Sequence, residues 1–225
     1  MQHERGRKPP DFHEQSVLDA ADETVGRARE MLGNLPITVL TTPMQRRPVL
    51  PTSPKMRKAF KAYLDDLIEQ AFSAEPGPPG NRSHDADHGS RIEAACMLCH
   101  GHCCLNGGPS NAFLTVEDVN RYRRENANAS RQDVRDAYFA LMPEETVLLS
   151  CVFHGPQGCT MPRTMRSDRC NSALCSSQRH LIDGEAAGDE AAVLVAEFRN
   201  RPIAVAVHGA DSGFQMIAEE PSGDS

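Results

Sequence analysis

The sequence has no tryptophan, few aromatic residues and no long apolar run. Aromatic residues make up 5% of the 225 residues, so an aliphatic core is expected. A membrane-spanning helix needs about 18 or more apolar residues in succession, so none is expected. The N-terminal residues have no apolar central stretch, so we expect no secretion signal and assign the protein to the cytoplasm, away from membranes.

The charge balance and the missing motifs exclude several classes of function. The formal net charge is −7, which disfavours general binding to nucleic acid. The sequence has no phosphate-binding glycine loop, no Gly-x-Ser-x-Gly motif and no dinucleotide fingerprint. A methyltransferase using adenosylmethionine would need a cofactor domain for which the chain is too short. No catalytic constellation is found, and whether the protein is an enzyme stays open.

Cysteines are absent from the first 95 and the last 50 residues, and all eight lie between. In a reducing compartment, clustered cysteines are metal ligands or redox groups before they are disulfides. Thiolates are soft ligands that suit zinc, copper(I) or an iron–sulfur cluster. We therefore predict a site for zinc or iron, the iron in one form as an iron–sulfur cluster. The predicted ligands are Cys96, Cys99, Cys103, Cys104, Cys151, Cys159, Cys170 and Cys175.

The spacing of the first four cysteines predicts which of them act together. On a helix, Cys96, Cys99 and Cys103 would share one narrow face, and Cys104 would point elsewhere. Gly101 is expected to break such a helix. In either case Cys96 and Cys99 should reach the same ion. The adjacent Cys103 and Cys104 have diverging side chains, which suit two centres or two edges of one cluster.

Three other interpretations of these residues compete with metal binding. Burial as small apolar residues suits one or two cysteines but not eight. A disulfide contributes ~2–5 kcal/mol and a structural zinc site an apparent ~10–16 kcal/mol, against a usual total stability of ~5–15 kcal/mol. One metal ion would thus decide whether 94–176 folds. His100, His102 and His154 are interpreted as surface residues, or as groups that support the ligands, rather than as ligands themselves.

The predicted fold is α+β, mainly α with short β segments: a small irregular cysteine-rich core flanked by helices and a C-terminal hairpin. The predicted divisions are a helical arm 1–75, a flexible linker 76–91, a cysteine-cluster metal-binding domain 92–180, and a C-terminal helix and β-hairpin 181–225 packing on the core. The linker contains His84, Asp85, Asp87 and His88, which we interpret as a solvated tract rather than a metal site.

Two helices are predicted in the arm, over 13–32 and from 53 to about 72, with irregular chain at 34–52. Ser53 is the expected N-cap of the second helix and Pro54 its first residue. The pair would form a helical hairpin or an arm (11–74) that packs on the core or docks a protein partner.

Further along the chain, two capping boxes predict helix starts, at Thr115 with Asp118 and at Ser130 with Asp133. Four segments complete the prediction: a short strand through 147–153 that delivers Cys151, a loop at 154–176, a helix near 188–199, and a strand at 203–207 paired with 214–217 across the turn 208–213.

The order and spacing of the cysteines resemble a known family. Cys96-x2-Cys99-x3-Cys103-Cys104, Leu114-Thr115-Val116-Glu117-Asp118, Cys151-Val152-Phe153, Cys159, Arg166-Ser167-Asp168-Arg169-Cys170 and Cys175 together are similar to the YkgJ-type cysteine-cluster family. The resemblance covers about 94–176 and implies a zinc- or iron-chelating domain with eight cysteine ligands. Ser167, Asn171 and Met161-Pro162 depart from the family pattern. A related domain in flagellin lysine methylases provides the one enzymatic precedent.

Three functions follow as expectations. The first is a structural or metal-handling protein that binds metal through the cysteines. The second is an iron–sulfur protein acting in or beside an enzyme that modifies protein side chains. The third is an adaptor whose arm 11–74 docks a protein partner and in which metal is only a staple. We further expect at least one metal centre to take sulfurs from both cysteine groups, 96–104 and 151–175. Loss of Cys170 is expected to affect metal binding more than loss of Cys104.

Overall fold

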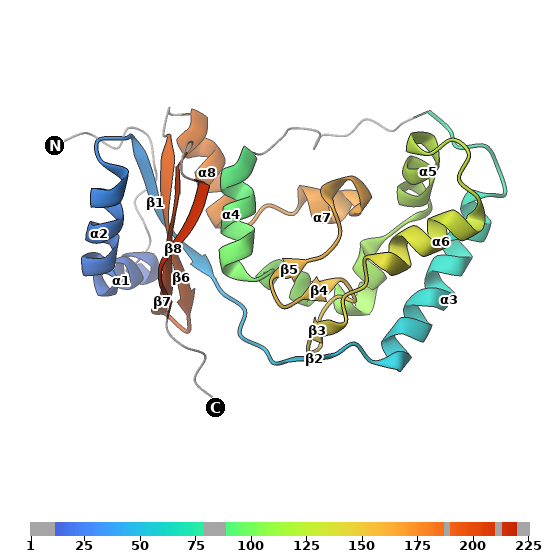
Figure 1. The fold of residues 1–225 in the computed structure, drawn as a ribbon, viewed down its shortest axis with the longest axis horizontal. Helices are drawn as coiled ribbons and strands as arrows, with labels where there is room; N and C mark the ends of the chain where they lie inside the picture. The colour runs from blue at the N-terminus through green and yellow to red at the C-terminus, as the bar shows by residue number, and fades with distance from the viewer. Residues whose placement is uncertain (1–11, 79–88, 187–189, 210–212, 220–225) are drawn as a thin grey trace. The chain divides into compact units, whose positions relative to one another are not determined.

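The computed structural model describes residues 12–78, 89–186, 190–209 and 213–219 (Figure 1). These residues form two compact units. Unit 1 comprises residues 1–46, 88–102 and 174–225, and unit 2 comprises 47–87 and 103–173. The chain therefore passes from one unit to the other four times. Both units contain helices and strands, which confirms the mixed α+β fold class.

The compact units do not follow the predicted division of the chain. The segment 1–75 is shared between the two units, and so is 92–180. The reason is the sheet of unit 1, which takes its first strand from the N-terminal segment and its other strands from the C-terminal one. Most of the predicted linker, including the four His and Asp residues in it, lies outside the described residues.

Unit 1 is built on a mixed four-stranded sheet of order β1-β6-β7-β8. The strands are β1 (Ile37–Pro43), β6 (Ala191–Phe198), β7 (Arg201–Gly209) and β8 (Gly213–Glu219). β1 runs parallel to β6, with Leu40 opposite Leu194. The remaining pairs are antiparallel. The predicted C-terminal hairpin is confirmed as β7 and β8, with Val207 opposite Gln215.

Two predictions within this sheet are wrong. Residues 191–198 form a strand rather than a helix, and 37–43 form a strand rather than irregular chain. β6 is central and its first six residues are buried, so both of its faces are apolar. Such a strand has no alternation of apolar and polar residues by which to recognise it.

Helices cover both faces of the sheet (Figure 1). α1 (Phe12–Ala20) and α2 (Asp22–Leu32) pack on the face that carries Val193 and Val205. α4 (Gly89–Cys99) and α8 (Ser176–Ala186) pack on the face that carries Leu40 and Leu194. The helix predicted over 13–32 is thus present as two helices that meet at Ala21, and its apolar stripe is buried in unit 1.

Unit 2 has three main helices around one apolar core. They are α3 (Pro54–Ala71), α5 (Val116–Glu125) and α6 (Arg131–Ala140). The largest fully buried side chains of this core are Phe60, Leu64, Ile68, Tyr138 and Phe153. The edge of the Phe153 ring meets Phe60, with ring centroids 5.0 Å apart. The core therefore joins the second predicted arm helix to the chain around the second cysteine group.

The predicted helix starts in unit 2 are confirmed. The Ser53 hydroxyl accepts a hydrogen bond from the Met56 amide at 3.1 Å, as an N-cap should. Both capping boxes are present: Asp118 accepts from the Thr115 amide and Asp133 from the Ser130 amide, each at 2.8 Å.

The remaining elements of unit 2 are short. They are β2 (Val49–Pro51) with β3 (Glu145–Val147), β4 (His154–Gly155) with β5 (Gly158–Cys159), the 3-10 helices η1 (His102–Asn106), η2 (Gly108–Phe113) and η3 (Arg163–Met165), and α7 (Asp168–Ser172). The strand predicted through 147–153 is wrong beyond Val147: Leu148 and Leu149 form an exposed turn. The predicted loop 154–176 contains four of these elements. No described helix is long and apolar enough to cross a membrane.

Candidate metal centre

The two units divide the cysteines unequally. Unit 2 holds Cys103, Cys104, Cys151, Cys159 and Cys170, and unit 1 holds Cys96, Cys99 and Cys175. All eight are free cysteines, so none forms a disulfide. The first four cysteines are divided between the two units just after the end of α4, where His100 and Gly101 have φ values of 51° and 72°. The predicted break at Gly101 is therefore confirmed, and the shared helical face of Cys96, Cys99 and Cys103 is not formed.

The five sulfurs of unit 2 come from four separate places in the chain. Cys103 and Cys104 lie in η1, and Cys151 lies in the turn between β3 and β4. Cys159 ends β5, opposite His154 of β4. Cys170 is the third residue of α7. Only the folded unit brings these positions together.

Cys104 is the central sulfur of the group. It is hydrogen-bonded to both Cys103 and Cys159, so it connects a cysteine of 96–104 with one of 151–175. These two bonds, together with burial, raise the pKa of Cys104 far above that of an ordinary thiol. The same bonds lower the pKa of Cys103 to about 7 and that of Cys159 to about 6. Cys104 is thus a thiol flanked by two thiols, Cys103 and Cys159, that ionise readily. These three residues are called the trio below.

This position of Cys104 is opposite to the predicted one. The helical projection set Cys104 apart from the other sulfurs and made it replaceable. In the structure residues 102–106 form a 3-10 helix with a tighter turn, so a 100° projection does not apply to them. That Cys170 matters more than Cys104 for metal binding stays a prediction.

Cys151 and Cys170 complete the group from its buried side. Burial raises the pKa of Cys151 to about 12 and raises that of Cys170. The charge of Cys159 adds to both shifts, which places these thiols near the trio. The Cys170 thiol donates to the carbonyl oxygen of Ala112 at 3.5 Å. A bound cation would reverse these shifts, because it stabilises thiolates directly.

The backbone around Cys104 and Cys151 is tightly fixed. The Cys104 carbonyl accepts from the Cys151 amide at 3.3 Å and from the Ser150 hydroxyl at 2.9 Å. Because Ser150 gives its only proton to that carbonyl, its oxygen must accept from His154 Nδ1, 2.6 Å away. A Cβ on Gly108 would lie 2.7 Å from the Ser150 carbonyl oxygen, so only glycine fits there. His154 is fully buried and supports the turn that carries Cys151.

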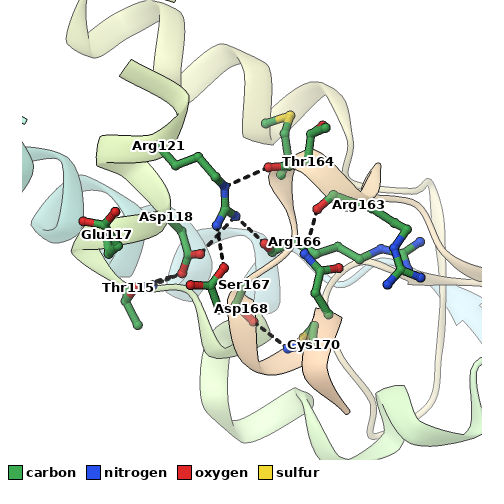
Figure 2. A network of polar contacts seen from close by, with 12 residues as sticks. Thr115, Glu117, Asp118, Arg121, Arg163, Thr164, Arg166, Ser167, Asp168 and Cys170 are labelled. Atoms are coloured by element: carbon green, nitrogen blue, oxygen red, sulfur yellow. Dashed lines mark hydrogen bonds and ion pairs between the residues drawn. The ribbon is translucent and has the colours of Figure 1, made fainter. Parts of the chain in front are cut away.

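A buried arginine holds the segment that leads to Cys170 (Figure 2). Arg121 of α5 is 3% exposed. Its guanidinium pairs with Asp118 at 3.0 Å and with Asp168 at 2.8 Å. It also donates to the carbonyl oxygens of Thr164, at 2.9 Å, and Arg166. Three of these four acceptors, Asp168 and the Thr164 and Arg166 carbonyls, therefore tie η3 and the start of α7 to helix α5.

The last link to Cys170 is a helix cap. The Ser167 hydroxyl, 1% exposed, accepts from the Cys170 amide at 3.1 Å. Ser167 is therefore the N-cap of α7, the helix that carries Cys170. Burial raises the pKa of Asp118, although Thr115 and Arg121 favour its charged form.

No family model, curated protein or solved structure matches the chain. The resemblance described above therefore stays a prediction. The arrangement of the residues alone has to support any function assigned to them.

The cysteines of unit 1 are arranged differently from those of unit 2. Cys96 and Cys99 lie on α4, and the Cys99 thiol donates to the Cys96 carbonyl at 3.4 Å. Cys175 directly precedes α8. The Gln178 amide links the two helices: its nitrogen donates to the Cys96 sulfur at 2.9 Å, and its oxygen accepts from the Cys175 amide at 3.0 Å. These contacts connect Cys96 and Cys175 through the side chain of Gln178.

The described residues contain no group of three His, Cys, Asp or Glu side chains already arranged to hold a metal ion. The sulfurs of unit 2 are gathered, as hydrogen-bonded thiols, without tetrahedral geometry. Their chemistry nevertheless fits a soft metal ion, because five thiols exceed the four that a closed zinc site or a four-iron cluster takes.

Sequence reasoning found all five sulfurs of unit 2 but missed the residues that fix them. Arg121 lies within the helix predicted from Thr115 and was not singled out. Its only signal is a charge on the apolar side of that helix, three residues after the capping Asp118. Arg166 was noted only as part of the resemblance, and Ser150 was not noted.

Proposed function

We propose that the protein binds zinc or iron through the thiolates of unit 2, as a structural or metal-handling protein. The observation that supports this most is Cys104, whose sulfur contacts Cys103 and Cys159 at once. Cys151 and Cys170 are the candidates for the fourth ligand. The resemblance to the YkgJ-type family belongs to this proposal, with the correction that its eight cysteines are divided between two units.

The negative charges of neighbouring thiolates favour a bound cation. Two like charges about 4 Å apart repel by ~4 kcal/mol at an effective dielectric constant of 20. Without metal, the trio limits this repulsion by sharing a proton among three sulfurs. A divalent cation would take the place of that proton and reduce the net charge of three thiolates from about −3 to about −1. A structural zinc site contributes an apparent ~10–16 kcal/mol, more than the repulsion it has to overcome.

An iron–sulfur cluster is the second candidate, because unit 2 has enough sulfurs to bind one. Five thiols are one more than a four-iron cluster needs. In this form the protein would act in or beside an enzyme that modifies protein side chains. A cytoplasmic location belongs to both candidates, because eight free cysteines are typical of a reducing compartment.

A protein partner for the arm 11–74 is a separate proposal. The apolar stripes of its helices are buried in the chain's own cores, by residues such as Val25 in unit 1 and Phe60 and Ile68 in unit 2. A partner would therefore have to bind the polar faces of these helices.

The test is anaerobic purification followed by elemental analysis and absorption spectroscopy. We expect one equivalent of zinc, or several of iron with a brown colour. Cys104→Ser and Cys159→Ser should lose the metal, and the matched control Cys175→Ser in unit 1 should keep it. Wild-type protein without stoichiometric metal would contradict the proposal. So would a Cys104→Ser variant that keeps its metal while Cys175→Ser loses it.

A further inference from the structure

We propose that unit 2 has a docking surface for an acidic protein segment. It consists of the exposed leucines Leu50, Leu148 and Leu149 together with Lys55 and Lys58 of α3, and it is called the leucine–lysine surface below. Metal is not needed for this docking. The surface gives the proposed partner of the arm 11–74 a place on the chain and a chemistry.

The turn after β3 holds a leucine in a conformation that leucine disfavours. Leu149 has a φ of 55° and is 75% exposed. A bulky side chain is strained at positive φ, where glycine and asparagine are accommodated. Because the side chain is exposed, it gains little from burial in return. Leu149 therefore costs stability without a matching contact inside unit 2, which is typical of a binding residue.

Two further exposed leucines lie beside this turn. The pairing of β2 with β3 continues into the turn, where the Leu148 amide donates to the Pro48 carbonyl at 2.8 Å. This register places Leu148 diagonally across from Leu50, and the two are 39% and 45% exposed. The Arg47 guanidinium donates to the Leu149 carbonyl at 3.1 Å and so holds the turn. Three leucines thus form one apolar area.

The chain that leads from β2 into α3 is basic, although the net charge of the whole chain is −7. Residues 47–64 contain no Asp or Glu, and their cations are Arg47, Lys55, Arg57, Lys58 and Lys61.

The two lysines of the surface have no carboxylate among the described residues. Lys55 and Lys58 are exposed, and their spacing of three makes them neighbours on α3. Lys61, one turn further on, pairs with Asp65 at 2.6 Å, but no described carboxylate pairs with either of these two. Lys55 lies in the first turn of α3, where a cation opposes the helix dipole. Its charge therefore does not stabilise the helix.

Hydrogen bonds join the start of α3 to the chain that enters β3 (Figure 1). The Thr52 amide donates to the Glu144 carbonyl at 2.8 Å. The Thr52 hydroxyl and the Arg57 guanidinium both donate to the Pro143 carbonyl, at 2.7 and 3.0 Å. A partner that covers the leucines of β2 and β3 therefore also meets the charge of the nearby lysines.

The mixture of side chains favours a protein as the partner. An apolar centre with a polar rim is typical of protein–protein interfaces, and exposed cations select a partner that carries Asp or Glu. Glu144 and Glu145 are exposed beside the leucines, at and just before the start of β3. A uniformly anionic surface such as a lipid bilayer would be repelled by these two carboxylates. A protein segment can place its own charges over the lysines and away from them.

The first test uses an array of short synthetic peptides in which the numbers of Glu and Leu vary independently, probed with the labelled full-length protein. We expect binding to increase with both residues and to weaken as salt is raised. Peptides with Lys in place of Glu are the control. Vesicles of phosphatidylcholine, with and without phosphatidylserine, measure the alternative of a membrane surface.

Two variants change the surface without harming the fold. Leu149→Asn removes the leucine, and asparagine tolerates the positive φ. Lys55→Glu with Lys58→Glu reverses the charge, and an acidic residue in the first turn suits the helix dipole. Each should bind the best acidic peptide ~10-fold or more weakly in fluorescence anisotropy. Both should melt at or above the temperature of the wild type, which a purely structural role would not allow.

Matched controls lie on α2 of unit 1. Met31→Asn changes a side chain that is 57% exposed, and Arg27→Glu with Arg29→Glu reverses the same number of charges. Both should change the affinity by less than about threefold, as residues outside an interface do.

Four results would overturn the inference: acidic peptides that bind no better than basic ones, equal losses in surface variants and controls, binding to phosphatidylserine vesicles alone, or a Leu149→Asn protein that melts well below the wild type. Wild-type protein without metal would overturn the proposed function and leave the leucine–lysine surface in place.

Discussion

The two units are stabilised by different kinds of contact. Unit 1 buries aliphatic side chains on both faces of a four-stranded sheet, between two pairs of helices. Unit 2 has one core around Phe60 and, beside it, a sulfur group and a buried arginine network held on short elements. The chain has so few aromatic residues that it cannot fill both units in the same manner. Unit 2 therefore combines an apolar core with polar and sulfur contacts on its short elements.

Removing the metal is expected to have the largest effect and to act on unit 2. The sulfurs would lose a cation with an apparent contribution of ~10–16 kcal/mol, while the sheet of unit 1 uses no thiolate. In hydrogen exchange after chelation, amides of β4, β5 and α7 should exchange faster, and those of β6 and β7 should stay protected. Equal exposure of both units would contradict the comparison.

Core truncations in the two units should respond differently to metal. Phe60→Ala in unit 2 is expected to cost ~3–5 kcal/mol and Leu194→Ala in unit 1 ~2–5 kcal/mol. Zinc at a hundred times its dissociation constant should return ~2.7 kcal/mol to the unit that binds it. Denaturant melts with and without zinc would show the recovery in Phe60→Ala alone. Recovery in Leu194→Ala would mean that the metal belongs to unit 1.

The buried arginine network should be worth more than an exposed ion pair on the same helix. Arg121→Met leaves Asp118 charged and buried, which costs ~3–5 kcal/mol. The matched control is Arg124→Met, which breaks a partly exposed pair with Glu117 and should cost at most ~1 kcal/mol. Adding Asp118→Asn to Arg121→Met should restore part of the loss. Thermal melts of the four proteins decide this, and similar melting temperatures for Arg121→Met and Arg124→Met would disprove it.

The smallest expected effect is a pH dependence of opposite sign at the two capping boxes. The bonds from Ser130 lower the pKa of Asp133, so its contribution is present above the unfolded pKa and is lost as pH falls through the folded one. Burial raises the pKa of Asp118, so its contribution is present below the unfolded pKa and is lost as pH rises through the folded one.

Stability curves between pH 2 and about 7 would test this difference. Asp133→Asn should flatten the rise of stability with pH, and Asp118→Asn should steepen it. Curves that change in the same direction for both variants would show that the two boxes have similar environments.

The parts of the fold that follow from local chemistry were predictable, and those that follow from distant pairing were not. Ser53, Thr115 and Ser130 mark helix starts because each satisfies amides within three residues of itself. β1 and β6 pair across about 150 residues, and nothing local to either segment signals the parallel partner. The Ala-rich β6, apolar over its first six residues, is therefore ambiguous until its neighbours are known.

The same distinction between local and distant features applies to the candidate site. Chemistry alone singled out the cysteines, because thiols in a reducing compartment are informative wherever they lie. Their grouping was not predictable, since two residues with positive φ separate Cys99 from Cys103, so that Cys96 and Cys99 lie in unit 1 and Cys103 and Cys104 in unit 2. Arg121 resembles a surface charge in the sequence, and only its carbonyl partners on another segment show that it is fixed.

The four passages of the chain between the units have a consequence for synthesis on the ribosome. Unit 2 is complete once residue 173 has been made, but unit 1 lacks β6, β7 and β8 until residue 219 has been made. At ~5–20 residues per second, this leaves the thiols of unit 2 assembled for seconds while β1 still waits for its partner strand. Under the proposed function, unit 2 would therefore capture metal before the sheet of unit 1 closes.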